Sequence, residues 1–334
     1  MKKKFLILTS LIIGISSLAF ILHKISIKEI TEQFISAKII HILAYTIVSI
    51  LLMYSLAWRW NVILKSQNIN LSFQKVFNYR LIGYGISYIT PSAKLGGEPV
   101  RALLLSNNKI KFSKALSSVV IDKTIEIASS AIFFFIGVIT ILFKLALPEE
   151  TGIILLIFAT AFLSTSIFIY QRLASGKGLI VDLCKSLKID KIKSLKLKEK
   201  KISSFEKLII KFFRHDKTDF LITMIISLLS WILMFLEFKF GLLILGYNVS
   251  FSSIFLIISF LGAALLIPIP LGLGAMEASQ IAVFPIIGMK TSTGVAISML
   301  TRARDIVWSI ISLMLLCYYG LSATKTIKKA LLKQ

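Results

Sequence analysis

Acidic residues, cysteine, histidine and proline are all scarce in this chain of 334 residues. It contains 16 Asp and Glu against 39 Lys and Arg, together with two Cys, three His and six Pro. Charged residues make up 16% of the chain and hydrophobic residues 56%, whereas a soluble domain carries about 25% charged residues. This composition excludes an ordinary soluble domain.

The few cysteines and histidines exclude two kinds of site. Cys184 lies in a basic segment and Cys317 lies near the end of the last apolar run, so they form no disulfide framework. His23, His41 and His215 show no ligand-like spacing, so we expect no metal ion. No nucleotide-binding motif is present either, and we expect no cofactor.

Long apolar runs are abundant, and several are long enough to cross about 30 Å of hydrocarbon. They predict an all-α polytopic membrane protein with spans over 5–22, 39–58, 115–143, 152–170, 220–245 and 295–319. Two further apolar stretches, about 76–106 and 253–288, hold Pro and Gly near their centres and are interpreted as re-entrant hairpins. Ser17-Leu18-Ala19 resembles a signal-peptidase site. The apolar run continues past Ala19, so we favour an uncleaved first span.

The net charge of +23 is carried by four segments, 1–4, 59–114, 171–219 and 325–334. Clusters of Lys and Arg between apolar spans are typical of cytoplasmic loops and of contact with anionic lipid. This distribution favours the cytoplasmic membrane over nucleic acid, with both termini in the cytoplasm. The first hairpin then enters from the cytoplasm and the second from outside. Segment 171–219 is predicted to be a solvated, basic helical linker.

One spacing recurs in both halves of the chain. Pro91 and Glu98 lie seven residues apart, as do Pro270 and Glu277, and the second pair follows the first by 179 residues. At the same offset further residues correspond: Gly83 with Gly262, Lys123 with Arg302, and Glu126 with Asp305. We therefore predict two repeats, each made of three spans and one hairpin.

The predicted repeats cover 1–143 and 144–334. Because three spans per repeat is an odd number, the second repeat is inverted relative to the first, a design that recurs in transporters. Non-helical backbone at membrane depth persists only when it is buried in protein or lines a wet cavity. The predicted hairpin breakers are Pro91, Gly96, Gly97, Pro268, Pro270, Gly272 and Gly274.

Charged residues fall within these apolar stretches, where each one costs about 2.5–3.5 kcal/mol at a helix centre unless it is paired or hydrated. One hypothesis is that they neutralise one another and lock the hairpins to the spans. The other is an anion-binding cavity, in which bases and helix N-termini bind phosphate and acids orient the bases or carry a proton. The candidate residues are Lys94, Glu98, Arg101, Lys123, Glu126, Glu277, Arg302, Arg304 and Asp305.

Two further groups are predicted to lie near the membrane surfaces. Trp58 and Trp60 flank Arg59 at the end of the second predicted span, as interfacial aromatic residues do. Glu237 and Lys239 are interpreted as a secondary pair near the outer interface, where the lysine would extend toward water.

The motifs "GGEPVRALLL" after "YITPSAK", "IPIPLGLGAMEAS" and "RARD" together resemble the lysylphosphatidylglycerol synthase-type transmembrane family, also called the flippase-like domain family. The resemblance covers essentially the whole chain. The family includes the membrane half of the bacterial multiple peptide resistance factor, which flips aminoacylated phosphatidylglycerol, and relatives linked to polyprenyl- or dolichyl-phosphate sugar pathways. It implies a translocation core formed by Gly96, Gly97, Glu98, Arg101, Pro270, Gly272, Gly274 and Glu277.

The resemblance predicts a lipid translocase that moves an anionic phospholipid or a polyprenyl-phosphate-type lipid across the cytoplasmic membrane. Its expected partners are membrane lipids with an anionic phosphate headgroup. Because the chain stops shortly after the last predicted span, we expect no soluble aminoacyl-transferase domain and no synthase activity. Two alternatives remain: a membrane-embedded enzyme acting on a lipid phosphate, with Glu98 or Glu277 as general base, and a non-transporting partner of a lipid or glycan biosynthesis enzyme.

Overall fold

The computed structural model describes residues 27–35, 37–90, 95–144, 149–178, 199–265, 267 and 269–319. Its elements are α2 (Ile27–Ile35), α3 (Ile39–Ser66), α4 (Phe73–Ile89), α5 (Gly97–Ser106), α6 (Phe112–Lys144), α7 (Glu149–Ala174), α10 (Glu199–His215), α11 (Lys217–Ile244), α12 (Phe251–Leu265), η2 (Pro270–Gly272), α13 (Ala275–Ile286) and α14 (Thr291–Tyr318). Several predictions lie outside the described residues: the span 5–22 with the Ser17–Ala19 motif, Pro91, Lys94, Pro268, His23 and Cys184.

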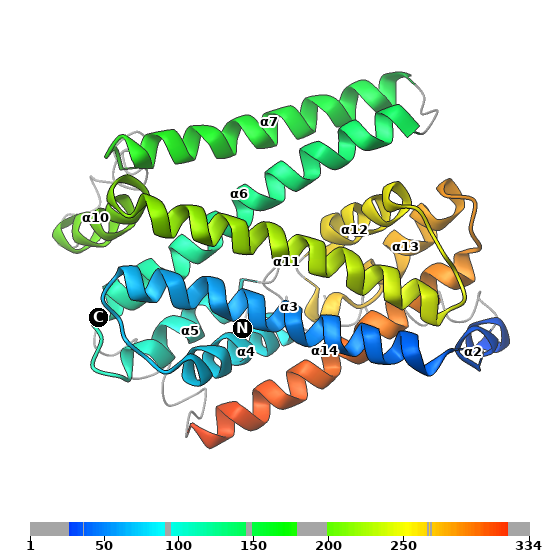
Figure 1. Cartoon of the computed structure of the whole chain (residues 1–334), viewed down its shortest axis with the longest axis horizontal. Helices are drawn as coiled ribbons and strands as arrows, with labels where there is room; N and C mark the ends of the chain where they lie inside the picture. Colours follow the sequence, from blue (N-terminus) through cyan, green and yellow to red (C-terminus); the bar gives the residue numbers. More distant parts are fainter. Residues whose placement is uncertain are drawn as a thin grey trace, which may run out of the picture.

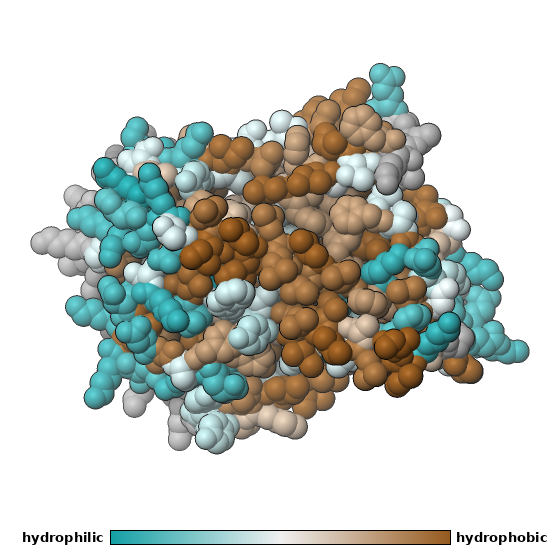
Figure 2. All heavy atoms as spheres, in the orientation of Figure 1, coloured by the Kyte–Doolittle hydropathy of each residue, from teal (hydrophilic) through white to brown (hydrophobic). Residues whose placement is uncertain are grey.

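Within the described residues, four helices are long and apolar enough to cross a membrane, namely α3, α6, α7 and α11. They confirm an all-helical, multi-pass membrane protein. Helix α14 is as long as α3, but Arg302, Arg304 and Asp305 lie near its middle. Figure 2 shows hydrophobic side chains across the centre of the visible face and hydrophilic ones toward both ends of the long axis, as expected for a bundle embedded in lipid.

The bundle is built around two long helices that run in opposite directions. Helices α3 and α11 lie side by side along the long axis (Figure 1), and the hydroxyls of Ser55 and Ser230 hydrogen-bond between them at 2.8 Å. Helix α4 packs along α14, where the Ser312 hydroxyl donates to the Leu81 carbonyl at 2.5 Å. Helices α6 and α7 form a pair at one edge (Figure 1), and most of α7 is exposed.

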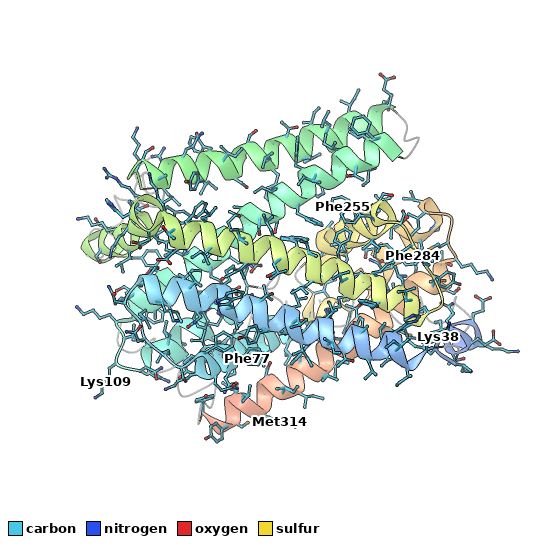
Figure 3. The ribbon with its side chains drawn as sticks, in the orientation of Figure 1. Lys38, Phe77, Lys109, Phe255, Phe284 and Met314 are labelled. Carbon is cyan, nitrogen blue, oxygen red and sulfur yellow. The ribbon has the colours of Figure 1, made fainter. Side chains whose placement is uncertain are left out.

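The two segments predicted as re-entrant hairpins each fold into a pair of helices, and the two pairs lie toward opposite ends of the long axis (Figure 1). Helices α4 and α5 lie toward the end that carries α10, whereas α12 and α13 lie toward the other end (Figure 1). Each pair has its own apolar core, one around Trp60 and Leu104, the other around Phe255 and Phe284 (Figure 3). The end of α4 contacts η2, so the first pair meets the turn of the second.

Glycine permits the close contact between α4 and α5. A Cβ atom added to Gly97 would lie 1.9 Å from the carbonyl oxygen of Gly83, a distance that no side chain can occupy. The Gly97 N–H donates to the Ser87 hydroxyl at 2.8 Å, which satisfies one N-terminal donor of α5. The α5 N-terminus is therefore held against α4 by backbone-to-backbone packing.

Two sequence-based predictions are wrong. Helix α3 does not end near Trp58 but continues to Ser66, so Arg59 and Trp60 are buried in the bundle instead of lying at an interface. Residues 199–215 are not a solvated linker, because α10 buries Phe212 and Phe213 against the bundle. The strongly amphipathic spacing of α10 is the reason, since an apolar stripe with a 3.6-residue period packs against a protein core.

Candidate functional site: two buried charge clusters

Charged side chains gather inside the bundle in two places. We call the first the α6 cluster, formed by Arg59, Arg80, Glu98, Arg101, Asp122, Lys123 and Glu126. We call the second the α14 cluster, formed by Glu237, Glu277, Arg302, Arg304 and Asp305, with the Tyr84 hydroxyl. No ion pair joins the two clusters in the described part of the chain.

Asp122 is the centre of the α6 cluster and is fully buried. Its carboxylate accepts hydrogen bonds from Arg59 Nε at 2.7 Å and from Arg101 Nη2 at 2.8 Å. The Arg101 guanidinium also lies 4.1 Å from the ring centre of Trp60, within cation–π range. Buried charges of this kind persist when they are paired and hydrogen-bonded, so these contacts lock α3, α5 and α6 together.

Glu126 is the second acceptor of the α6 cluster. It accepts from Lys123 Nζ at 2.6 Å and from Arg59 Nη2 at 3.1 Å. Lys123 also lies 3.8 Å from Glu98, which stands in the first turn of α5. These contacts bring Glu98, Lys123 and Glu126 together. By themselves the contacts confirm none of the functional roles predicted for these three residues.

Arg80 on α4 is held less tightly than the other arginines. Its terminal nitrogens lie 3.6 Å from Glu126 and 4.0 Å from Asp122, too far for hydrogen bonds. Its Nε is buried without a hydrogen-bond partner among the described residues, and its side chain is 13% exposed. Arg80 therefore lies at the edge of the α6 cluster with N–H groups that form no hydrogen bond to the described residues.

In the α14 cluster, Glu277 both caps a helix and pairs with an arginine. Its Oε2 accepts from the Gly274 N–H at 3.0 Å, at the start of α13, and its Oε1 accepts from Arg302 at 2.5 and 3.1 Å. Arg302 also donates to the Leu271 carbonyl at 3.0 Å. The turn before α13 needs positive φ angles at Gly272 (60°) and Gly274 (74°), which glycine adopts without strain.

The rest of the α14 cluster centres on Arg304. Its Nε and Nη2 donate to Asp305 at 2.9 and 2.6 Å, and its Nη1 donates to Glu237. The Tyr84 hydroxyl donates to Asp305 at 2.5 Å. The predicted Glu237–Lys239 pair is wrong, because Glu237 points into the bundle, whereas Lys239 donates to Asn248 Oδ1 in the loop after α11.

The candidate residues of the sequence divide between the clusters. Glu98, Arg101, Lys123 and Glu126 lie in the α6 cluster, and Glu277, Arg302, Arg304 and Asp305 in the α14 cluster. Sequence reasoning missed Arg59, Arg80, Asp122, Glu237 and Tyr84. The four charged residues among them lie in or next to apolar segments. The free-energy cost of inserting a charged side chain into the membrane was the signal that could have identified them.

A small gap separates the tips of the two helix pairs. It is lined by Ser87, Tyr88, Thr90, Leu265, Ile267, Ile269 and Gly272 and has room for about one water molecule. It lies next to Leu271, whose carbonyl binds Arg302. Within the described residues, no group of three or more His, Cys, Asp and Glu side chains is arranged to hold a metal ion.

The chain is similar to known membrane proteins over most of its length. The family model described as lysylphosphatidylglycerol synthase TM region matches residues 7–312. A UPF0104 membrane protein of Pyrococcus horikoshii is 27% identical over 321 residues, 90% of this chain and 92% of that protein. A UPF0104 membrane protein of Methanocaldococcus jannaschii is 28% identical over 312 residues, 87% of this chain and 88% of that protein.

Proposed function

The chain belongs to the lysylphosphatidylglycerol synthase TM region family, and from that membership and its buried basic residues we propose that it moves an anionic lipid across the membrane. The substrate class is an anionic phospholipid or a polyprenyl-phosphate-type lipid, recognised by its phosphate. The tails stay in the bilayer while the headgroup passes through the bundle along the two charge clusters.

The observation that carries the proposal is the charge of the α6 cluster. Among the described residues it holds four bases, Arg59, Arg80, Arg101 and Lys123, against three carboxylates. The excess of one positive charge is buried in a membrane protein, where an uncompensated charge is costly. A phosphate would neutralise it, and the unoccupied donors of Arg80 fit phosphate in a bidentate manner.

The helix starts support two inverted repeats as the frame of transport. Corresponding helices begin 178 or 179 residues apart: Ile39 and Lys217, Phe73 and Phe251, Gly97 and Ala275, and Phe112 and Thr291. The ion pairs correspond as well, since Glu98–Lys123 and Glu277–Arg302 occupy equivalent positions at 3.8 and 2.5 Å. We assign the α4–α5 and α12–α13 pairs as hairpins that enter the membrane from opposite sides.

Alternating access follows from this frame. The tips of the hairpins meet at a gap for about one water molecule, too small for a phosphate headgroup. The headgroup therefore reaches the clusters from one side at a time, when one hairpin moves away from the other. Arg302 and Arg304 are already bound by carboxylates and keep the α14 cluster closed, so Arg80 is the first basic contact for the phosphate.

Lipid exchange in vesicles tests the proposal. The purified protein is placed in phosphatidylcholine vesicles with a trace of fluorescent phosphatidylglycerol or of a fluorescent polyprenyl phosphate, and a membrane-impermeant quencher reports exchange between leaflets. The wild type should accelerate exchange of at least one anionic tracer. The exchange rate of the Arg80→Gln variant should be about tenfold lower than that of the wild type. This is the effect expected when one charge-assisted contact worth about 1.4 kcal/mol is lost.

The matched control is Lys65→Gln, which removes a positive charge from an exposed position of α3 and should keep the wild-type rate. Fluorescent phosphatidylcholine, which has no net charge, should exchange more slowly than the anionic tracers. Failure of the wild type to accelerate either anionic tracer would reject a translocase of this class. Equal rates for Arg80→Gln and the wild type would reject the assigned phosphate contact.

A further inference from the structure

The α14 cluster has the opposite charge imbalance to the α6 cluster. Three carboxylates, those of Glu237, Glu277 and Asp305, face only two guanidiniums, those of Arg302 and Arg304. The described residues of this cluster therefore carry one excess negative charge inside the bundle. A buried charge without a counterion is costly, and binding of a proton is the smallest change that removes it.

The three carboxylates of the α14 cluster differ in how many hydrogen bonds they accept. Glu277 accepts from Arg302 twice and from the Gly274 N–H. Asp305 accepts from Arg304 twice and from the Tyr84 hydroxyl. Among the described residues, Glu237 accepts only from Arg304, which it shares with Asp305. Since hydrogen bonds to a carboxylate stabilise its charged form, Glu237 is the carboxylate of this cluster whose charge is least stabilised by hydrogen bonds.

Glu237 also has a carboxylate oxygen without a hydrogen-bond partner among the described residues. Glu237 is 1% exposed, and its Oε1 is buried without a hydrogen-bond partner among the described residues. A buried acceptor left unsatisfied costs about 1–3 kcal/mol and more when it is charged. An ionised Glu237 therefore carries an unsatisfied buried oxygen in addition to its share of the excess negative charge.

The groups that face Glu237 come from three helices. Arg304 and Asp305 face it from α14, Tyr45 faces it from α3, and Tyr84 faces it from α4. Helix α12, which also packs against α11, contains no charged residue. Among the described residues, Arg304 is the base that forms an ion pair with Glu237, and it is shared with Asp305.

A route for a proton leads from the gap between the hairpin tips. The gap is lined by Tyr88, whose hydroxyl is buried without a hydrogen-bond partner among the described residues. Tyr88 interacts electrostatically with Asp305, Arg302 and Glu277. A water molecule in this gap would give the Tyr88 hydroxyl a partner and bring a proton to the edge of the α14 cluster.

We infer that the α14 cluster is a proton-binding site, with Glu237 as the group that takes up the proton, and that its occupancy is coupled to the anionic lipid. The coupling rests on the proposed function, whereas proton binding does not. One proton delivered by a hydronium ion converts the Glu237 carboxylate into a neutral carboxyl group and leaves one water molecule. The bound proton then neutralises the excess negative charge of the α14 cluster, and one phosphate charge neutralises the excess positive charge of the α6 cluster.

Helix α4 links the two sites. Arg80 and Tyr84 stand four residues apart on one face of the helix, and they reach Glu126 and Asp305 respectively. A shift of α4 that follows neutralisation of one cluster therefore changes the contacts of the other. This is a coupling through one rigid element that both sites contact.

Infrared difference spectroscopy tests proton binding without transport. Spectra of the purified wild type in detergent are recorded in acidic and in alkaline buffer. The difference between them should contain the C=O stretch of a buried, protonated carboxyl group. The band should be lost in Glu237→Gln and shifted in Glu237→Asp, which keeps a titratable group. Glu150→Gln, at an exposed carboxylate of α7, should keep it. A band that is unchanged in a folded Glu237→Gln variant overturns the assignment.

Vesicles with a pH difference test the coupling. If one proton moves with each lipid, the ratio of the anionic tracer in the two leaflets should change about tenfold for each unit of pH difference in the wild type. The reason is that one pH unit is a tenfold ratio of proton activity. In Glu237→Gln the distribution of the tracer between the leaflets should no longer depend on the pH difference. If no anionic tracer moves while the infrared band depends on Glu237, the translocase proposal fails and the proton site stands. Exchange in the wild type that ignores the pH difference overturns the coupling.

Discussion

Arg80 and Tyr84 lie one turn apart on α4, and each enters a different buried charge cluster. The Arg80 guanidinium lies 3.6 Å from Glu126, whereas the Tyr84 hydroxyl donates to Asp305 at 2.5 Å. The charges of α6 and α14 thus meet adjacent turns of one helix, which packs along α14 and contacts η2. Beyond the vesicle and infrared experiments above, three predictions test how the clusters and the helix pairs are held, and a fourth tests the orientation in the membrane.

Replacing Tyr84 by Phe should destabilise the protein by about 1.5–3 kcal/mol, because a hydrogen bond to a charged group is lost and Asp305 keeps its buried carboxylate. Thermal unfolding in detergent measures the change. Tyr54→Phe is the matched control, because Tyr54 is 48% exposed and packs only its ring against Phe73; it should stay within about 0.5 kcal/mol of the wild type. Equal unfolding temperatures for the two variants would contradict the role of the hydroxyl.

Asp122→Asn should be among the most destabilising polar substitutions, at about 3–5 kcal/mol, because it leaves Arg59 and Arg101 without their shared counterion. Adding Arg101→Gln to Asp122→Asn should recover part of that loss, since Arg101 is the cation left without a carboxylate partner, whereas Arg59 keeps Glu126. A double-mutant cycle on unfolding free energies measures the coupling. Simple additivity of the two losses would show that the buried pair is not what holds α5 to α6.

Two glycines that lie within helices should respond differently to alanine. Gly97→Ala places a Cβ 1.9 Å from the Gly83 carbonyl oxygen and should cost about 3 kcal/mol or more, because backbone has to move. Gly262→Ala meets nothing within 4 Å on α12 and should leave stability unchanged or raise it by about 0.5–1 kcal/mol. Expression level and unfolding temperature distinguish the outcomes; a well-folded Gly97→Ala protein would rule out the close α4–α5 crossing.

Single cysteines should report the orientation in the membrane. Lys38 and Lys109 lie at opposite ends of the bundle (Figure 3) and both are exposed. In a background with Cys184→Ser and Cys317→Ser, Lys38→Cys should react with an impermeant maleimide added to intact cells, and Lys109→Cys only after the cells are opened. The opposite pattern would place the basic loops outside and reverse the predicted orientation.

Much of the helical framework could be predicted from the sequence, because it depends on local properties. Apolar length located α3, α6, α7 and α11, and Pro and Gly within apolar stretches located both helix pairs. The ends of helices were less predictable. The sequence predicts that a span ends at Arg59, because a charge is normally placed at an interface, but a partner from α6 allows α3 to continue through it.

The candidate site was predictable only in part. The spacing along the chain matches Glu98 with Glu277 and Lys123 with Arg302, but only the structure shows that each acid pairs with the base of its own half. Arg80, Asp122 and Glu237 have no such counterparts. Their partners come from distant helices, and no periodicity along one helix indicates which residue of another will face it.

The sequence by itself determined that this chain is a helical membrane protein with two glycine- and proline-interrupted segments, since hydrocarbon thickness and backbone hydrogen bonding allow few alternatives for so apolar a chain. Only the tertiary structure decided which charges share a counterion. Pairing depends on distances of a few ångströms between helices, and those distances place one excess positive charge around Asp122 and one excess negative charge around Arg304.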